Sequence, residues 1–340
     1  MTTLEPAPVF DHLLRMTDQN GTFEHACFGE PRTEHGYCTD DMARVLVVAS
    51  REPHANDNLH DLAALTLRYL DGALADDGCC HNRMDRTGRW LDEPSVSDWW
   101  GRCIWGLGTA AAHSDVPAHR QAATAQFERA VQQRSPWPRA MSYAVLGAAE
   151  LVSADCAHRE ARSLLVDYAN TVAKPNGNPA WPWPEERLTY ANAVLPEAMI
   201  AAGTALEDTA LCRHGLDLLS WLVAVEINGD HLSPTPVGGR GPGETGPAFD
   251  QQPIEVSALA EACARAAAVD PSPLWPACVR MAAAWFTGSN DAGHVMWDQR
   301  TGAGFDGLRV DGVNENQGAE STLAVLATLQ QAKRFPEPGR

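Results

Sequence analysis

The chain is poor in basic residues and has no long apolar run. Of 340 residues, 26 are Lys or Arg and 44 are Asp or Glu, giving a formal net charge of -18. Nucleic acids and anionic membranes require a basic binding face, so we expect neither as a partner. No apolar run approaches the roughly 18 residues of a membrane span. These absences favour a soluble protein acting on a small molecule.

Signals for export, metal binding and nucleotide binding are also lacking. The first residues, MTTLEPAPVFDHLLRM, contain no basic segment followed by an apolar stretch, so we expect no secretion signal and a cytoplasmic location. The nine cysteines are scattered, mostly in apolar helical segments, which is typical of reduced, buried thiols. Cys79-Cys80-His81 is the only cluster, and the glycine patterns of dinucleotide and NTP sites are missing. We therefore predict neither a metal nor an organic cofactor.

One kind of helical segment recurs along the chain. Each copy begins with polar residues and continues with small apolar ones, at a spacing of roughly 40 to 65 residues that is typical of repeated supersecondary units. The copies are residues 39–50, 97–112, 135–151, 188–203, 249–266 and 314–330. Amphipathic segments separate them, at residues 58–74, 118–134, 158–172, 210–225 and 273–288.

The alternation of these two kinds of segment predicts the fold. A helix that is apolar nearly all round is buried, and a helix with one charged face covers it. The pattern therefore predicts an all-α (α/α)6 toroid, in which six helical hairpins form an inner and an outer ring with long irregular loops at one end. We expect a single domain over residues 1–340. An irregular helical domain or a helical solenoid is the alternative.

Polar residues gather at the start of each repeated segment. Acids there are stabilised by the partial positive charge and free N–H groups of a helix N-terminus, and Asp and Asn are ordinary N-caps. Capping needs only one short acceptor per helix, whereas residues 40–41, 250–252 and 314–317 supply several. The surplus predicts a shared polar pocket. The paired positions are Asp40/Arg44, Asp98/Arg102, Asn192/Glu197, Asp250/Glu255 and Glu315/Glu320.

The loops between segments are long and rich in tryptophan, glycine or proline. Sugar rings have apolar faces that pack on indoles and hydroxyls that bind carboxylates and amides. Trp99 and Trp100 begin one repeat, and Trp181 and Trp183 lie in a loop. For Trp181 and Trp183, the alternative to sugar binding is packing of the loop onto the core. Residues 228–248 contain glycines that suit a mobile lid, although an inert loop has the same composition. The loops favour a carbohydrate substrate.

Five motifs together resemble a bacterial family often labelled "glycosyltransferase", whose members are encoded near or fused to glycosyltransferases or mannoside phosphorylases. The resemblance covers residues 10–330, implies an (α/α)6 toroid related to glycoside hydrolases, and implies no nucleotide-sugar domain. This sequence departs from the family where Met42 replaces an Asn and where Trp99 and Trp100 replace Ser and His. We expect a substrate with a more apolar portion, or loss of the original chemistry. The motifs are HGYCTDDMARVLVV, NRMDRTGRWLDE, WPWPEERLTYANAVLPEAMIAAG, FDQQPIE and DGVNENQGAEST.

Glycoside cleavage usually needs two carboxyl groups, one as acid and one as base or nucleophile. We predict a glycoside hydrolase-like enzyme with Asp41, Asp250 and Glu315 as catalytic residues. A non-hydrolytic sugar enzyme (phosphorylase, epimerase or lyase) and a non-catalytic glycan-binding protein are the alternatives. The predicted substrate-binding residues are Asp40, Arg44, Asp98, Trp99, Trp100, Arg102, Glu186, Arg187, Tyr190, Asn192, Gln251, Gln252, Glu255, Asn316, Gln317 and Glu320.

Overall fold

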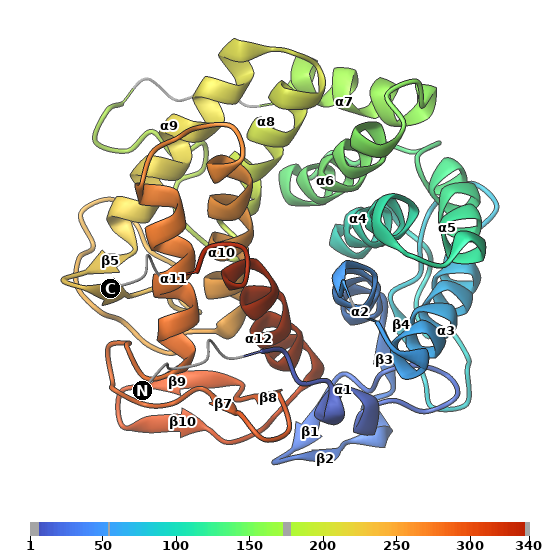
Figure 1. The fold of residues 1–340 in the computed structure, drawn as a ribbon, viewed down its shortest axis with the longest axis horizontal. Helices are drawn as coiled ribbons and strands as arrows, with labels where there is room; N and C mark the ends of the chain where they lie inside the picture. Colours follow the sequence, from blue (N-terminus) through green and yellow to red (C-terminus); the bar gives the residue numbers. More distant parts are fainter. Residues whose placement is uncertain (1–6, 54, 173–177, 337–340) are drawn as a thin grey trace.

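The computed structural model describes residues 7–53, 55–172 and 178–336. The two ends of the predicted domain, residues 1–6 and 337–340, lie outside the described residues. Six helices form a closed inner ring, and each contacts the next, with the last returning to the first (Figure 1). The inner helices are α2 (Thr39–Arg51), α4 (Asp98–His113), α6 (Pro138–Ala154), α8 (Val194–Ala205), α10 (Pro253–Ala267) and α12 (Ala319–Ala332).

An outer layer of helices covers this ring. Each outer helix packs on the inner helix that precedes it in the chain, except that the short α1 packs on α12. The outer helices are α1 (Asp11–Arg15), α3 (Asp57–Ala73), α5 (Pro117–Ala130), α7 (Arg159–Thr171), α9 (Thr209–Val225) and α11 (Leu274–Phe286). The (α/α)6 toroid predicted from the alternating segments is thereby confirmed. None of the described helices combines the length and the apolar character that a bilayer span requires.

The two layers differ in burial and in the way their helices begin. In α8 every residue from Val194 to Gly203 is buried, whereas α7 buries only one face. Asn56, His158 and Asp208 cap outer helices through their side chains. None of the six inner helices has a side-chain N-cap. The polar residues at the inner helix starts therefore serve something other than capping.

Glycines let the inner helices α4 and α6 approach closely. A Cβ atom added at Gly108 would lie 2.1 Å from the Gly147 backbone oxygen, and one added at Gly101 would lie 2.1 Å from that of Ala140. Such contacts are too short for any larger side chain. This packing fixes α4, which carries Asp98 and Arg102, against its neighbour.

The inner helices α8, α10 and α12 begin four to six residues later than predicted, at Val194, Pro253 and Ala319. The predicted segment starting at residue 188 becomes helical only at Val194, because residues 188–193 form a loop whose N–H groups bind Glu255. Pro253 starts α10, since a proline at the first turn sacrifices no hydrogen bond. Before α12, residues 312–314 pair as a strand. Asp250 and Glu315 consequently lie on loops ahead of their helices.

Among the described residues, short hairpins and one 3-10 turn, η1 (Thr33–His35), lie in the connections between the helices. All strands pair antiparallel in two-stranded sheets. Their residues are β1 (Ala26–Cys27), β2 (Glu30–Pro31), β3 (Tyr37–Cys38), β4 (Arg83–Met84), β5 (Ile227–Asn228), β6 (His231–Leu232), β7 (Trp297–Asp298), β8 (Ala303–Gly304), β9 (Gly307–Arg309) and β10 (Gly312–Asn314).

Candidate functional site

Two adjoining cavities lie at the N-terminal ends of the inner helices, and Asp40 and Arg102 line both. Their volumes, about 420 and about 480 Å³, suit a small ligand. We call the first the acidic cavity; its walls are Glu24, His25, Cys38, Asp40, Asp41, Arg44, Arg83, Arg102, Gln252, Asp306, Asn314, Gly318, Glu320 and Ser321. The second is the aromatic cavity; its walls are Asp40, Asn82, Ser97, Asp98, Trp99, Arg102, Trp137, Pro138, Arg139, Glu185 and Tyr190.

Asp41 is the most deeply placed acid of the acidic cavity. Its residue is only 2% exposed, and its Oδ1 accepts a hydrogen bond from Arg44 Nη1 at 2.7 Å. Burial raises the pKa of Asp41 to about 7; Glu320 and Glu24 add to the rise and Arg44 opposes it. A carboxyl group with this pKa exchanges its proton near neutrality, as a general acid must.

A second carboxylate stands close to Asp41. An oxygen of Glu24, the sulfur of Cys38 and an oxygen of Asp41 lie within 4.8 Å of one another. Glu24 also forms an ion pair with Arg83, and the Cys38 thiol donates to Asp41 Oδ2 at 3.2 Å. The two carboxyl groups therefore share one small region, each with its own guanidinium partner.

Arg102 joins the two cavities. Its Nη1 donates to Asp40 Oδ1 at 2.5 Å and lies 3.7 Å from Asp98 Oδ2. Its guanidinium also stacks on the Tyr143 ring, 4.5 Å from the ring centroid. Because the arginine is held by two acids and by the ring of Tyr143, it gives the shared wall a fixed positive charge.

Aromatic side chains and a second ion pair form the walls of the aromatic cavity. Trp137 is 59% exposed and Tyr190 is 46% exposed, and the Tyr190 hydroxyl donates to Asp98 Oδ2 at 2.8 Å. Arg139 makes two hydrogen bonds to Glu185, at 2.6 and 2.8 Å. Exposed rings held above charged groups are a suitable surface for the apolar face of a sugar.

The structure brings part of the predicted site together at these cavities. Four predicted residues line the acidic cavity alone, and three more line the aromatic cavity alone. Together with the shared Asp40 and Arg102, the predicted residues that line the cavities are Asp41, Arg44, Gln252, Glu320, Asp98, Trp99 and Tyr190.

Other predicted residues lie behind the cavity walls. Trp100 is fully buried in the core and donates to the Ala130 carbonyl at 3.1 Å. Gln251 is also fully buried and donates to Asp291 at 2.7 Å. Glu255 accepts from the loop at Ala191 and Asn192, and it supports that loop from beneath.

The remaining predicted residues line neither cavity. Asp250 and Glu315 are exposed on the loops before α10 and α12, and Asp250 lies 3.8 Å from Arg309. Glu186 is exposed, and Arg187 is paired with Glu244 at 2.8 Å. Asn316 accepts from the Phe28 N–H at 3.0 Å, and Gln317 accepts from the His12 ring through its backbone oxygen.

Several cavity residues were not predicted from the sequence. Most of them belong to short hairpins and loops outside the six repeated segments, where no periodic pattern marks them. Asp306, for example, accepts from the Gly318 N–H at 2.8 Å, and burial raises its pKa. Two of them had a usable signal: Arg139 lies at the start of the predicted segment 135–151, and Glu185 adjoins the predicted Glu186 in the loop WPWPEERLTY. The Asp, Glu, Arg and His residues among them are Glu24, His25, Arg83, Arg139, Glu185 and Asp306.

Two groups of described side chains place three possible metal ligands within 4.8 Å of one another, namely Glu24–Cys38–Asp41 and Glu128–His158–Glu160. In the first, both carboxylates already have arginine partners, and burial raises the pKa of the Cys38 thiol, which disfavours the thiolate that binds metals. In the second, His158 Nδ1 caps α7. We assign a metal to neither group.

No family model and no curated protein matches the sequence. Solved structures match it along almost its whole length. A sugar epimerase from a ruminal bacterium has a TM-score of 0.69 at 14% identity, covering 97% of this chain and 96% of its own. The cellobiose 2-epimerase from Spirochaeta thermophila has a TM-score of 0.66 at 12% identity, covering 96% and 94%.

Glycoside hydrolases share the same fold. The GH76A α-1,6-mannanase from Salegentibacter has a TM-score of 0.63 at 11% identity, covering 95% of this chain and 96% of its own. The predicted resemblance to (α/α)6 glycoside-hydrolase-like proteins is therefore confirmed at the level of the fold. At such low identities the likeness shows a shared fold alone. The reaction has to be inferred from the residues of the site.

Proposed function

We propose that this protein is a carbohydrate-active enzyme that cleaves a glycosidic bond in the acidic cavity. One observation carries the proposal: Asp41 is a buried carboxyl group whose pKa is about 7, and an oxygen of Glu24 lies within 4.8 Å of it. Glycoside hydrolysis usually requires a proton donor and a second carboxylate close to it. Asp41 then protonates the leaving oxygen while Glu24 attacks the anomeric carbon.

The second half-reaction returns both groups to their starting state. After the first step Glu24 is esterified to the sugar and Asp41 is ionised. Asp41 removes a proton from water, the water oxygen attacks the anomeric carbon, and Glu24 leaves as a carboxylate. Carboxyl groups about 5 Å apart are typical of retaining enzymes, and those of inverting enzymes are roughly 6.5–9.5 Å apart. The proposed enzyme is accordingly retaining.

The adjoining aromatic cavity suits the other part of the substrate. Trp137 and Tyr190 offer exposed rings, and Asp40 and Arg102 stand where the two cavities meet. Two neighbouring cavities of this size favour a small oligosaccharide or a glycoside with an apolar aglycone. Inactive variants of the Salegentibacter mannanase, made by replacing two consecutive aspartates, bind α-1,6-mannotriose or mannotetrose; Asp40 and Asp41 are likewise consecutive.

Sugar epimerisation is the second candidate. It is favoured by His25, which lines the acidic cavity and packs edge-on against His35 with ring centroids 5.0 Å apart. An imidazole changes its charge near neutral pH and can move a proton at a carbon beside a carbonyl. Two of the proteins that share the fold are named as sugar epimerases.

The experiment uses a panel of mannosides, glucosides and arabinosides, with cellobiose as an epimerisation substrate, followed by proton NMR. We expect new reducing ends with retained anomeric configuration. Asp41→Asn and Glu24→Gln each lower kcat by about 100-fold or more, the range expected for a lost acid or nucleophile. Asp250→Asn and Glu315→Gln are the matched controls, because both carboxylates are exposed and line neither cavity.

The outcomes separate the candidates. Epimerised disaccharide without hydrolysis, lost in His25→Ala, replaces the hydrolase with the epimerase. If Asp250→Asn or Glu315→Gln is as damaging as Asp41→Asn, catalysis involves the helix-front acids predicted from sequence. A stabilising ligand without any product, with Trp99→Ala more damaging than Asp41→Asn, identifies a glycan-binding protein instead.

A further inference from the structure

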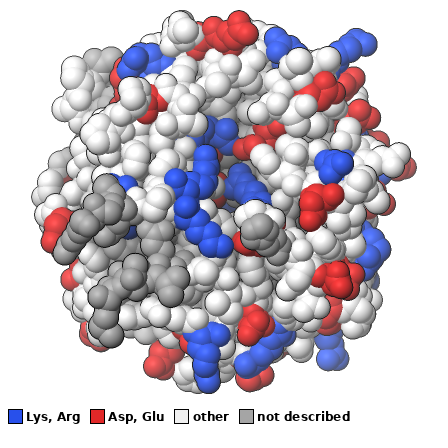
Figure 2. Space-filling model, in the orientation of Figure 1, with Lys and Arg blue, Asp and Glu red and all other residues white. Residues whose placement is uncertain are grey.

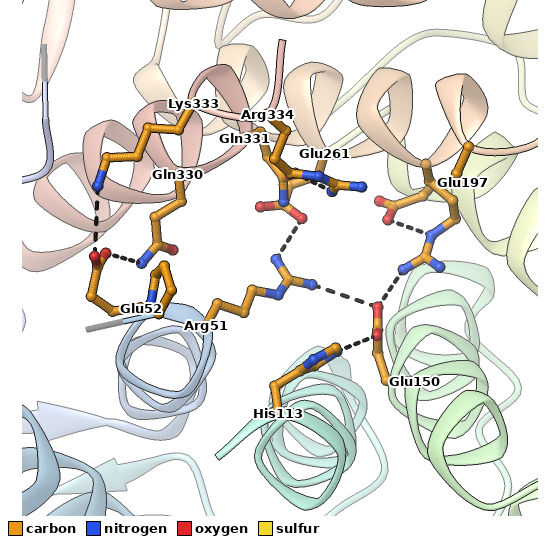
Figure 3. Close-up of a pocket in the computed structure, with 13 residues that line it drawn as sticks. Arg51, Glu52, His113, Glu150, Glu197, Glu261, Gln330, Gln331, Lys333 and Arg334 are labelled. Carbon is orange, nitrogen blue, oxygen red and sulfur yellow. Dashed lines mark hydrogen bonds and ion pairs between the residues drawn. The ribbon is translucent and has the colours of Figure 1, made fainter. Parts of the chain in front are cut away.

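A further large cavity, which we call the rear cavity, opens at the end of the barrel opposite the acidic and aromatic cavities. Its volume is about 520 Å³, and it is lined mainly by the last turns of the inner helices (Figure 3). Basic side chains gather around a central hollow in the face drawn in Figure 2, although the protein carries a formal net charge of -18. In the wall of the cavity, Arg51, Arg265, Lys333 and Arg334 balance Glu52, Glu150, Glu197 and Glu261, so the cavity is less acidic than the molecule as a whole.

Ion pairs across the ring form the wall of the rear cavity. Arg51 lies 2.6 Å from Glu261 and 3.7 Å from Glu150, while Arg265 lies 2.7 Å from Glu150 and 3.0 Å from Glu197. Cations are stabilised at helix C-termini, where the backbone carbonyls carry partial negative charge. These pairs therefore have a structural explanation of their own.

Two buried acceptors in the same wall have no donor. The amide nitrogen of Gln330 donates to the Val48 carbonyl at 2.9 Å and to Glu52 at 3.1 Å, so both its protons are used and its orientation is fixed. Gln330 Oε1 and Glu261 Oε1 have no hydrogen-bond partner, and the residues are only 9% and 7% exposed. A buried acceptor without a donor costs about 1–3 kcal/mol, which a ligand hydroxyl group would recover.

One cation of the rear cavity lacks an acidic partner. Arg334 donates to Gln331 Oε1 at 2.7 Å and forms no ion pair with any residue that the structure describes. Arg334 is exposed as a residue; partial burial lowers its pKa, Arg51 and Arg265 add to the fall, and Glu261 and Glu150 oppose it. An anion bound beside Arg334 would supply the ion-pair partner that the described residues do not.

We propose that the rear cavity binds a small polyhydroxylated anion, either a sugar phosphate or a sugar acid. The anionic group pairs with Arg334, and hydroxyl groups donate to Gln330 Oε1 and Glu261 Oε1. The two requirements together disfavour inorganic phosphate, whose hydroxyl groups lie on the same small anion that must pair with Arg334, and a neutral sugar, which lacks the charge. The site is separate from the acidic cavity, so the inference does not depend on the proposed reaction.

Calorimetric titration of the 340-residue protein tests the site. The probes are glucose 6-phosphate, gluconate, inorganic phosphate and glucose. We expect at least one of the two anionic polyols to bind about 10-fold more tightly than phosphate or glucose, a difference of one charge-assisted hydrogen bond. Arg334→Gln weakens that binding about 10-fold, whereas Arg334→Lys, which keeps the charge, weakens it less.

The control is Arg213→Gln, since Arg213 is an exposed arginine on the outer helix α9; it leaves the affinity unchanged. Circular dichroism establishes that each variant is folded. Equal affinity in Arg334→Gln and the parent protein would overturn the proposal, and so would phosphate binding as tightly as both polyols. Loss of glycosidase activity in an acidic-cavity variant such as Asp41→Asn, with polyol binding intact, would separate the two sites.

Discussion

Arg44 on the first inner helix and Glu320 on the last form an ion pair, with Nη2 of the arginine 2.9 Å from Oε2 of the acid. The same guanidinium donates to Asp41 at 2.7 Å. One side chain thus links α2 to α12, where the ring closes, and positions the proposed general acid. Closure of the barrel and assembly of the acidic cavity consequently depend on a common residue.

Arg44→Met should shift the pH profile of catalysis. Arg44 lowers the pKa of Asp41, against the effect of burial, so removing the guanidinium raises that pKa further. Because a general acid works while protonated, the alkaline limb of kcat/KM moves upward by about one pH unit, the order of effect of one nearby charge. Arg44→Lys, the control, shifts the limb less. An alkaline limb that stays in place would remove Asp41 from the acid role.

Glu255→Gln should change how stability depends on pH. Burial, together with Glu226, raises the pKa of Glu255 from 4.5 to about 8. Between these values the folded state holds a proton that the unfolded state releases, so this contribution to stability is complete below pH 4.5 and falls by about 1.4 kcal/mol per pH unit as pH rises toward 8. Glu255→Gln removes that slope.

Urea unfolding at pH 6 and pH 8 measures the effect of Glu255→Gln. Other buried acids, such as Asp41 and Glu197, whose pKa values are also raised to about 7, contribute in the same direction. The quantity to compare is therefore the change in the free energy of unfolding between pH 6 and pH 8, measured in the parent protein and in Glu255→Gln. An identical pH dependence in both would contradict the raised pKa.

Gly108→Ala should destabilise the barrel. The added Cβ would lie 2.1 Å from the Gly147 backbone oxygen, and because both atoms belong to packed helices neither can move freely. Overpacking of this kind costs about 1–3 kcal/mol, and occasionally more. Gly238→Ala is the control, because nothing lies within 4 Å of its added Cβ and its φ is not positive. Equal Tm values for the two variants would show that α4 and α6 are less tightly packed.

Trp137→Ala should weaken substrate binding more than it slows the bond cleavage. Trp137 is 59% exposed and lines the aromatic cavity, away from Asp41. Loss of an aromatic platform of this kind raises KM by about 10-fold with little change in kcat. Tyr190→Phe keeps the ring and removes the bond to Asp98, so it separates stacking from hydrogen bonding. A fall in kcat alone would place the ring at the reacting centre.

The architecture could be predicted because it depends on local patterns that repeat. Each inner helix is apolar on nearly all sides, and each outer helix is apolar on one side. Both patterns are set by residues that lie close together in the chain. The single domain over 1–340 and the catalytic roles of Asp250 and Glu315 stay predictions. The predicted start of α8 was wrong, because Glu255, which lies more than 60 residues away in the chain, binds the loop before this helix.

The sequence by itself determined the ring, the end at which the polar residues gather, and part of the cavity wall, including Asp40, Asp41, Arg44 and Arg102. Only the tertiary structure decided that Glu24 stands beside Asp41 and that Trp100 faces the core. The physical reason is that helix periodicity fixes which face of a helix is buried, while a hairpin such as the one bearing Glu24 is positioned by contacts with distant segments. The rear cavity likewise exists only because six helix ends converge.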